Sequence, residues 1–271
     1  TLDRSSAASD VYKRQVWTAT YRRKSRRPCA WLRRARLLKP SRTLLESCVI
    51  NMATISWHPQ SEPNPLPFSP FKASTVPRPI GWLSSVDGEG RENIAPYSQW
   101  QNLTFDPPMV MFSANQYPDG RRKDTVLNAE ETGWFVWNMA TYDLREEVNK
   151  SAQVLDYGDS EWDRLSVTKE YADNHHIPMV KESPVKFECQ YKTTLRVPGN
   201  SKVGSIDLVV ADVKTIHIDE SVIDEEGKLD ILKIKPIARM GYFDYTVVTE
   251  KFEMRVPGSD DAARAGLEGS A

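Results

Sequence analysis

Short apolar runs separated by turn residues dominate the chain from residue 79 onwards, a pattern typical of β-strands. The alternation of apolar and polar residues is clearest before residue 218. Apolar side chains recur there at nearly every second position, at Val203, Ile206, Leu208, Val210, Val213, Ile216 and Ile218. The spacing slips near Ala211 and Asp212, which predicts a β-bulge at that point.

Further strands are expected at residues 79–86, 93–100, 108–115, 134–140 and 184–197. A glycine-containing turn after Val86 predicts a hairpin between the first two. Helices are predicted at residues 124–132 and after Asp143, whose carboxylate is expected to cap the second one. That helix would carry Leu144, Val148 and Ala152 on one face. Many short strands with few helices predict a mainly β domain of the α+β kind, a closed or nearly closed barrel with inserted helices.

Prolines restrict the backbone conformation and hydrogen bonding of two segments. Seven of the 18 prolines lie between Pro59 and Pro79, so residues 52–78 are expected to form an extended lead-in rather than a helix or an internal strand. Pro96 lies inside a predicted strand, although proline cannot donate a hydrogen bond to a neighbouring strand. It marks either a plain edge strand or a segment whose unpaired backbone groups face a ligand, and the residues alone favour the plain edge.

The first 51 residues differ in charge from the rest of the chain. They hold 13 basic against 3 acidic residues, which leaves 23 basic against 34 acidic residues in the remainder. Such a segment is either sequence foreign to the fold, a disordered basic leader, or a mitochondrial transit peptide. Nothing in it alternates like packed structure, and Met52 offers an alternative start. We therefore expect the domain at residues 79–257, with residues 258–271 as a disordered tail.

Composition also excludes several classes of protein. The acidic remainder disfavours nucleic-acid binding, and no apolar run approaches the roughly 18 residues that cross a bilayer. Of the three cysteines, Cys29, Cys48 and Cys189, only the last lies in the expected domain, so neither a disulfide framework nor a zinc site is predicted. A cytoplasmic location is expected, or a mitochondrial one if the leader is genuine.

No self-contained catalytic motif is present in the sequence. The histidines, His58, His175, His176 and His217, lack metal-ligand spacing. His175 and His176 are expected to be solvated, His217 to be a structural residue in a strand, and Cys189 to be buried. Because no metal site and no catalytic side chain can be assigned, an enzyme with this sequence needs a cofactor for its chemistry.

A cluster of three cations, Arg121, Arg122 and Lys123, lies directly before the predicted helix at residue 124. The first turn of a helix has unpaired N–H groups that attract phosphate, and Lys123 and Thr125 would add an ammonium and a hydroxyl. Asp124 argues against this, because its carboxylate can cap the helix itself and would repel a phosphate. From the residues alone, capping is narrowly favoured.

Taken in order, these segments resemble the flavin-reductase-like family, whose members bind FMN in a split β-barrel. The resemblance runs through RPIGWLSSVDGEGRENIAPYS, DPPMVMFSAN, KDTVLNAEETGWFVWNM, PVKFECQY, GSIDLVVADVKTIHIDE and IKPIARMGYFDY. It covers residues 76–245, leaves the first 51 without a counterpart, and implies a split barrel of Greek-key type. One departure is Tyr242, where the family often has a second glycine, and this leaves the size of the substrate open.

The resemblance also implies a set of site residues. Lys123 and Thr125 would hold the FMN phosphate, with Asp124 in a structural role, while backbone groups of residues 95–98 line the flavin ring. Arg78 and Pro79 match the start of the first barrel strand, and Arg239 and Tyr242 are weaker candidates for the rim of the cleft. The full set implied for FMN is Arg78, Pro79, Ala95, Pro96, Tyr97, Ser98, Ser113, Lys123, Asp124, Thr125 and Asn138.

The activity implied by the resemblance is that of a flavin reductase. NADH or NADPH would give a hydride to FMN, which would pass electrons to a small-molecule acceptor or to a monooxygenase partner. A homodimer is implied, and aromatic side chains in residues 134–138 and 243–245 are expected to be exposed beside the cleft. Two alternatives stay open: a non-catalytic barrel that binds flavin or another ligand, and a relative that acts directly on a small phenolic or quinone-like substrate.

Overall fold

The computed structural model describes residues 54–155, 159–172 and 175–254. The chain divides into two units between His58 and Pro59, and every described helix and strand lies in the second unit. Its largest element is a seven-stranded antiparallel sheet. The strands, in sequence order, are β2 (Gly81–Val86), β3 (Glu92–Tyr97), β4 (Trp100–Phe105), β5 (Pro108–Asn115), β6 (Trp134–Met139), β9 (Val185–Val197) and β10 (Ile206–Ile218).

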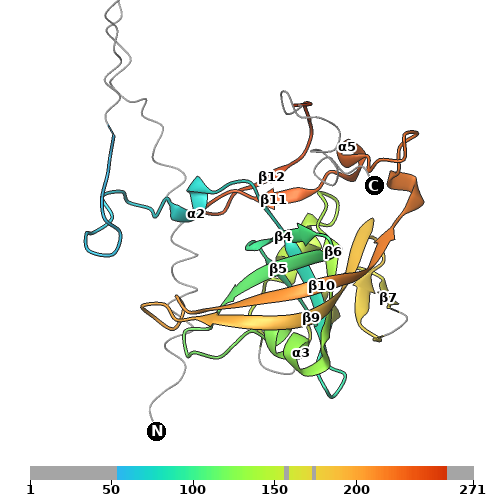
Figure 1. The fold of residues 1–271 in the computed structure, drawn as a ribbon, viewed down its shortest axis with the longest axis horizontal. Helices are drawn as coiled ribbons and strands as arrows, with labels where there is room; N and C mark the ends of the chain where they lie inside the picture. The colour runs from blue at the N-terminus through green and yellow to red at the C-terminus, as the bar shows by residue number, and fades with distance from the viewer. Residues whose placement is uncertain (1–53, 156–158, 173–174, 255–271) are drawn as a thin grey trace, which may run out of the picture. The chain divides into compact units, whose positions relative to one another are not determined.

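The sheet rolls up until its two edge strands meet. Its spatial order is β3-β2-β6-β9-β10-β5-β4, so the strands at opposite edges, β3 and β4, are consecutive in sequence. Only Ser98 and Gln99 separate them, and the Ser113 amide donates to the Gln99 carbonyl at 2.9 Å across this corner. A sheet whose first and last strands share a two-residue corner must close into a barrel. Figure 1 shows β4, β5, β10 and β9 side by side along this barrel.

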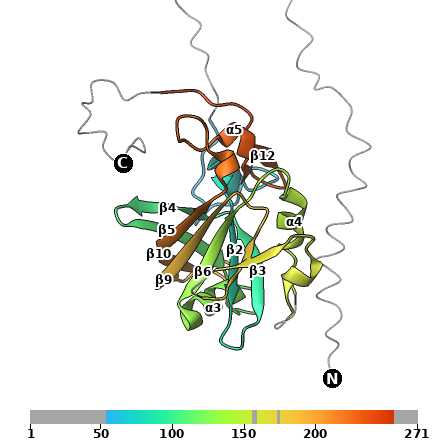
Figure 2. The ribbon, with the colours of Figure 1, turned by 90° about the vertical axis from the view of Figure 1, so that its right-hand side faces the viewer.

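The connection from β5 to β6 produces the Greek-key character of the barrel. Instead of pairing with β5, strand β6 pairs with β2, and the hairpin of β9 and β10 fills the space between β6 and β5. Helix α3 (Asp124–Thr132) lies on this connection. Its Val126 and Ala129 are fully buried in the barrel core. Figure 2 shows α3 at the end of the barrel opposite α5 and β12.

Smaller elements surround the barrel. A three-stranded sheet contains β1 (Arg78–Pro79), β11 (Ile237–Arg239) and β12 (Tyr245–Val247), and a two-stranded sheet contains β7 (Lys169–Tyr171) and β8 (Pro178–Val180). The remaining helices are short: α2 (Phe71–Ser74), α4 (Arg145–Lys150), α5 (Ile231–Ile234), and the 3-10 turns η2 (Glu161–Arg164) and η3 (Glu220–Val222). No helix among the described residues is long and apolar enough to span a membrane.

Aromatic side chains fill the barrel interior beside the corner. Trp100 stacks on Trp137 with ring centroids 5.6 Å apart and planes 8° from parallel, and Phe112 and Phe135 are fully buried. Such pairs contribute roughly 0.5–1.5 kcal/mol beyond the area they bury. Trp100 also packs against the backbone of Gly81, where an added Cβ would lie only 3.0 Å from three atoms of the Trp100 side chain, its Cβ and two indole carbons.

Most predicted elements are confirmed. The helix at 124–132 has the expected bounds, Cys189 is buried, and the β10–β9 register shifts at Val210/Ala211, next to the predicted bulge. His217 is a structural histidine whose Nε2 lies 2.7 Å from Glu188 Oε1. The predicted leader and tail, residues 1–51 and 258–271, lie outside the described residues.

Several predictions about local structure were wrong. The strand expected at 93–100 is two strands, because the chain turns at Ser98 and Gln99. Asp143 does not cap α4, which starts at Arg145 with Leu144 as its N-cap residue. The lead-in at 52–78 contains a helical turn, α2. Arg78 and Pro79 belong to β1, which pairs with β11, so the first barrel strand begins at Gly81.

Two predictions about exposure were also wrong. His175 is not solvated, since its ring stacks on Trp134 with centroids 3.6 Å apart and its Nε2 lies 2.8 Å from the buried Glu188. The aromatic strand at 134–138 is not exposed, because it is β6, a central strand with Phe135 and Trp137 in the core. At residues 243–245 the predicted exposure is observed, as Phe243 is 82% exposed and Tyr245 44% exposed.

The alternating apolar residues of β10 before its first register shift, Ile206, Leu208 and Val210, face outwards rather than inwards, whereas Val213 packs against the core. Asp207, Val209 and Ala211 are the buried residues, while Ile206 and Leu208 are only half-buried. The interior positions take small residues and one paired carboxylate, since Asp207 Oδ2 lies 3.1 Å from Arg122 Nε. The apolar set therefore forms a partly exposed surface, the outer stripe, made of Met111, Leu195, Val197, Ile206, Leu208 and Val210.

We predict that Gly81→Ala destabilises the barrel by about 1–3 kcal/mol, since the new methyl group forces the Trp100 indole away from the corner. Chemical denaturation followed by tryptophan fluorescence measures the change. Gly88→Ala is the matched control, because the added Cβ meets only the flexible carboxylate of Glu131. Equal stability of the two variants would contradict this account of the corner.

Candidate functional site

Ten of the eleven residues predicted to bind cofactor line three hollows around the end of β3. The lysine hollow, of about 100 Å³, is lined by Asn93, Ala95, Pro96, Tyr97, Tyr117, Lys123, Asp124, Thr125, Ser151, Ala152, Gln153, Val154 and Glu161. The arginine hollow, of about 210 Å³, is lined by Lys72, Arg78, Ile80, Pro96, Ser98, Ala152, Arg239, Tyr242 and Tyr245. The corner hollow, of about 470 Å³, is lined by Thr75, Val76, Pro77, Arg78, Pro79, Ser98, Gln99, Trp100, Gln101, Met111 and Ser113.

The three hollows are neighbours because they share lining residues. Pro96 and Ala152 line both the lysine and the arginine hollow. Arg78 and Ser98 line both the arginine and the corner hollow. The tertiary structure thus arranges the predicted residues along one edge of the barrel, from the start of α3 to the β3–β4 corner.

Strand β3 contributes an interrupted edge to this cleft. It pairs with β2 on one side, and in the sheet order it has no partner on the other side. Pro96 has no N–H group, so this edge cannot continue a regular hydrogen-bond ladder there. The residues alone had favoured a plain edge strand; the structure shows an edge that faces two of the hollows.

Lys123 lies at the start of α3 as its N-cap residue, with φ −73° and ψ 141°, and its side chain makes no capping hydrogen bond. Asp124 is the first helical residue, so the expectation that its carboxylate caps the helix was wrong. Within the described chain, the backbone amides of Asp124 and Thr125 have no backbone partner. Both residues line the lysine hollow, so the unpaired donors at the start of the helix lie beside it.

The three cations before α3 have different environments. Arg121 forms an exposed ion pair with Asp119 at 2.7 Å, and Arg122 binds Glu130 in a forked pair at 2.6 and 2.7 Å. Lys123 pairs with no carboxylate among the described residues, and its Nζ lies 3.3 Å from the centroid of the Tyr117 ring. Desolvation by burial lowers the pKa of Lys123, so an anion beside this ammonium would be stabilising.

A buried hydrogen-bond chain joins the start of α3 to β3. The Tyr97 hydroxyl donates to Thr125 Oγ1 at 3.0 Å, and Thr125 Oγ1 donates to Asn93 Oδ1 at 2.8 Å. Asn93 Nδ2 then donates to Glu161 Oε2 at 2.9 Å. Thr125 is fully buried and its hydroxyl proton is used within this chain, so its backbone amide is the donor left for a ligand.

Two carboxyl groups, those of Asp124 and Glu161, line the same hollow as Lys123. Desolvation by burial raises the pKa of Asp124. Burial likewise raises the pKa of Glu161, although hydrogen bonds from the Ile94 amide and Asn93 partly oppose this shift. The electrostatic potential of the lysine hollow is therefore mixed, with one ammonium facing two carboxyl groups that resist ionisation.

Asn138 is the predicted site residue that the structure does not bring to the cleft. It is fully buried, its Nδ2 donates to the Trp82 carbonyl and to Ser84 Oγ, and its Oδ1 accepts from the Val180 amide at 2.8 Å. Its amide group already has partners on β2 and β8, so Asn138 does not belong to the proposed site.

Some lining residues were missed by sequence reasoning. Asn93, Tyr117 and Glu161 come from three separate segments, and none of them belongs to a chemical motif. Tyr117 lies six residues before Lys123 and could have been found by its proximity to the cation cluster. Glu161 lies in a polar region without periodicity, so nothing in the sequence signals its contact with β3.

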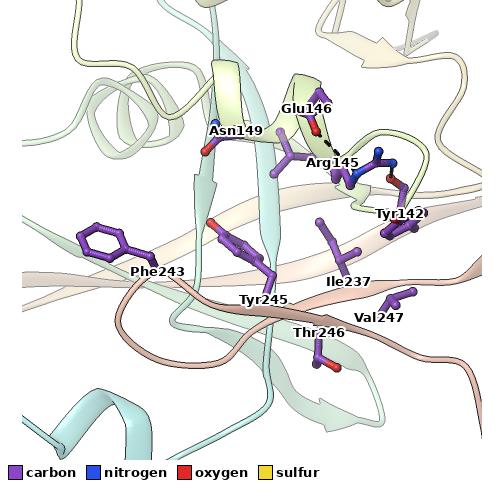
Figure 3. A pocket seen from close by; sticks show the side chains of 10 residues that line it. Tyr142, Arg145, Glu146, Asn149, Ile237, Phe243, Tyr245, Thr246 and Val247 are labelled. Carbon is purple, nitrogen blue, oxygen red and sulfur yellow. Dashed lines mark hydrogen bonds and ion pairs between the residues drawn. The ribbon is translucent and has the colours of Figure 1, made fainter. Parts of the chain in front are cut away.

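A further apolar hollow lies on the other side of Tyr245 and is shown in Figure 3. It encloses about 330 Å³ between α4 and the end of the three-stranded sheet, and Val148, Ile237 and Val247 contribute aliphatic surface to it. Arg145, at its rim, donates to the Tyr142 carbonyl at 2.7 Å. The candidate cofactor residues do not reach this hollow.

Comparison with known proteins agrees with this fold. The model of the flavin reductase like domain matches residues 73–245. The chain belongs to the flavin reductase-like family. The predicted split β-barrel is therefore confirmed, with helices inserted between its strands.

Individual relatives and solved structures resemble the chain over most of its length. The uncharacterized protein YwrF of Bacillus subtilis is 31% identical over 69% of this chain and 91% of its own. Nitrilotriacetate monooxygenase component B from Bacillus cereus matches with a TM-score of 0.68 and 28% identity, over 74% of this chain and 99% of its own. The 2-nitrobenzoate 2-nitroreductase NbaA of Pseudomonas fluorescens matches with a TM-score of 0.60 and 25% identity, over 69% and 89%.

The raised pKa of Glu161 predicts a pH dependence of stability. A carboxyl group whose pKa is higher in the folded than in the unfolded protein stabilises the fold when protonated, and this contribution disappears as the pH rises through the folded pKa. We therefore expect Glu161→Gln to gain stability relative to the unchanged protein between about pH 5 and about pH 8. Urea denaturation at both pH values measures the difference. A difference that does not change with pH, or that changes in the opposite direction, would contradict the burial effect.

Proposed function

We propose that the protein is an FMN-binding oxidoreductase that takes a hydride from NADH or NADPH and passes electrons to a small-molecule acceptor. The observation that carries this proposal is Lys123, a half-buried ammonium that pairs with no described carboxylate. It lies at the start of a nine-residue helix and beside the interrupted edge of β3. A phosphate group and a planar polar ring are the two parts of a ligand that such a pair of features fits.

The lysine hollow fits the FMN phosphate. Lys123 would supply the charge, and the amides of Asp124 and Thr125 would supply hydrogen bonds at the positive end of the α3 dipole. The hydrogen-bond chain through Tyr97, Thr125 and Asn93 holds these amides in place against β3. Asp124 and Glu161 oppose the phosphate only when ionised, and burial makes their ionisation harder.

The flavin ring would lie along residues 95–98. Pro96 and Ser98 line the arginine hollow, and Arg78, Pro79 and Ser113 border the ring position from the corner hollow. FMN, when bound, supplies the hydride and electron transfer chemistry. The protein contributes position, exclusion of water and electrostatics, and we assign no catalytic side chain.

A second candidate shares the cofactor but differs in the acceptor. The similarity to a protein described as a nitroreductase supports direct reduction of a small aromatic substrate. The similarity to a monooxygenase component supports a different acceptor, a partner enzyme that receives the reduced flavin. A third alternative is a barrel that binds flavin without catalysing a reaction.

Reduction under anaerobic conditions separates these candidates. Purified protein should bind FMN with quenched flavin fluorescence, and NADH or NADPH should then bleach its visible absorption. Bleaching that a nitroaromatic compound reverses would favour the direct reductase. Binding without bleaching would favour the non-catalytic barrel and contradict the proposed activity.

The phosphate contact leads to a sharper prediction. Lys123→Ala should weaken FMN binding roughly ten- to hundredfold and riboflavin binding much less, since riboflavin lacks the phosphate. Fluorescence titration with both flavins measures the two effects. Arg121→Ala is the matched control, because the neighbouring cation is already paired with Asp119. Equal losses for FMN and riboflavin would remove Lys123 from the phosphate site.

We also propose a homodimer that covers the outer stripe. Leu195 is 58% exposed, and the stripe borders the corner hollow, because Leu208 pairs with Ser113 in the β10–β5 register. An exposed apolar strip on a sheet face is typical of a protein interface.

Leu195→Glu should therefore give monomers in light scattering, whereas Ile223→Glu, at an exposed apolar residue outside the stripe, should not. A dimer that survives Leu195→Glu would place the interface elsewhere.

A further inference from the structure

The arginine hollow differs from the lysine hollow in charge. Lys72, Arg78 and Arg239 line it, and no acidic residue does. The lysine hollow, by contrast, combines one lysine with Asp124 and Glu161. The most positive part of the cleft is therefore not the part next to α3.

Two of these cations are direct cross-strand partners. Arg78 of β1 lies opposite Arg239 of β11 in the antiparallel register, so both side chains project from the same face of the small sheet. Like charges at directly opposed positions destabilise a strand pair. Among the described residues, no carboxylate forms an ion pair with Lys72, Arg78 or Arg239 to offset this repulsion.

The backbone holds both guanidinium groups in place. Arg78 Nη1 donates to the carbonyls of Thr75 and Met240 at 3.2 and 3.0 Å, and to that of Lys72. Its Nε is buried and has no hydrogen-bond partner in the described structure. Arg239 Nη2 donates to the Tyr242 carbonyl, and its guanidinium lies 4.6 Å from the centre of the Tyr245 ring.

The chemistry of Arg78 agrees with an incomplete site. Desolvation lowers the pKa of its guanidinium, and the neighbouring charge of Arg239 lowers it further. An anion placed between the two side chains would offset both effects, because an opposite charge favours the protonated guanidinium.

Two tyrosines, Tyr242 and Tyr245, form part of the wall of the hollow. Tyr242 adopts a left-handed backbone conformation with φ 51°, where a side chain is rarely found and a glycine would be free of strain. The neighbouring Gly241 lets this turn approach α2, because a Cβ there would lie 2.4 Å from that of Ala73. The strained turn places Tyr242 in the lining of the hollow, to which the aliphatic Ile80 also belongs.

We propose that the arginine hollow is a subsite for an anionic group, a phosphate or a carboxylate, carried by the second ligand of the enzyme. That ligand is either the nicotinamide nucleotide that supplies the hydride or a carboxylate-bearing acceptor. The hollow holds the charged group only, since its volume is about 210 Å³. Because it shares Pro96 and Ser98 with the flanking hollows, a ligand anchored there reaches the flavin position along β3. The statement that this ligand reaches the flavin rests on the proposed function, which places the flavin along β3.

Calorimetric titration of the full-length, FMN-loaded protein with inorganic pyrophosphate and, separately, with benzoate tests the subsite without reference to activity. We expect one of the two probes to bind, and Arg239→Gln to weaken that binding about tenfold, as expected for the loss of one charge-assisted contact. Arg239→Lys should retain most of the affinity because it keeps the charge. Binding of pyrophosphate identifies a nucleotide phosphate as the source of the anion, and binding of benzoate identifies an acceptor carboxylate.

Arg145→Gln is the matched control. Like Arg239, Arg145 donates to a tyrosine carbonyl and lies over a tyrosine ring, at 4.0 Å from its centre, but it lines the separate hollow of Figure 3. The Arg145→Gln substitution should leave the binding of pyrophosphate and benzoate unchanged. Failure of both probes to bind, or equal binding by Arg239→Gln and the unchanged protein, would overturn the subsite.

Flavin titrations separate this inference from the proposed function. If Arg239→Gln weakens FMN but not riboflavin while Lys123→Ala affects neither, the FMN phosphate occupies the arginine hollow, and both the subsite and the phosphate assignment are wrong. If Lys123→Ala behaves as expected and Arg239→Gln leaves probe binding intact, only the subsite is wrong.

Discussion

The meeting of β3 and β4 at a two-residue corner is the constraint on which the rest of the structure depends. Because Ser98 and Gln99 join the two edges of the seven-stranded sheet, the sheet must roll up, and its interior then takes the aromatic residues that flank the corner. The same closure leaves β3 as an edge that Pro96 interrupts. A regular ladder at this position would have sealed the barrel wall where the cleft now lies.

Buried hydrogen bonds fix the start of α3 relative to β3, the strand that ends at this corner. Each bond in the chain from Tyr97 through Thr125 and Asn93 to Glu161 contributes only about 1 kcal/mol net, but leaving any of these buried groups unpaired would cost more. The chain therefore fixes the position of the helix relative to β3 more than it stabilises the fold. It also explains why Thr125 is fully buried and yet next to a ligand-sized hollow.

Charge is distributed unevenly along the cleft. At one end, Lys123 faces two carboxyl groups whose ionisation burial disfavours. In the middle of the cleft, Arg78 and Arg239 lie opposite each other in the β1–β11 register without a described counter-ion. A single ligand with one phosphate does not satisfy both places, and this is the physical reason to expect two anionic groups, on two ligands, in one cleft.

The sequence by itself determined the strand at 108–115, the strand predicted at 134–140 to within one residue, the helix at 124–132, the bulge in β10 and, through the order of its motifs, the family. These are local properties, because apolar periodicity, helix propensity and proline act within a few residues. Only the tertiary structure decided which face of β10 is buried, since closure of the barrel left room inside for Val209 and Ala211 but not for the larger set that alternates with them. It also decided that Asn138 is internal, that Glu161 reaches β3, and that Arg78 opposes Arg239. Each of these contacts joins segments at least 40 residues apart in the sequence. Patterns within a few residues of one another do not predict contacts of such long range.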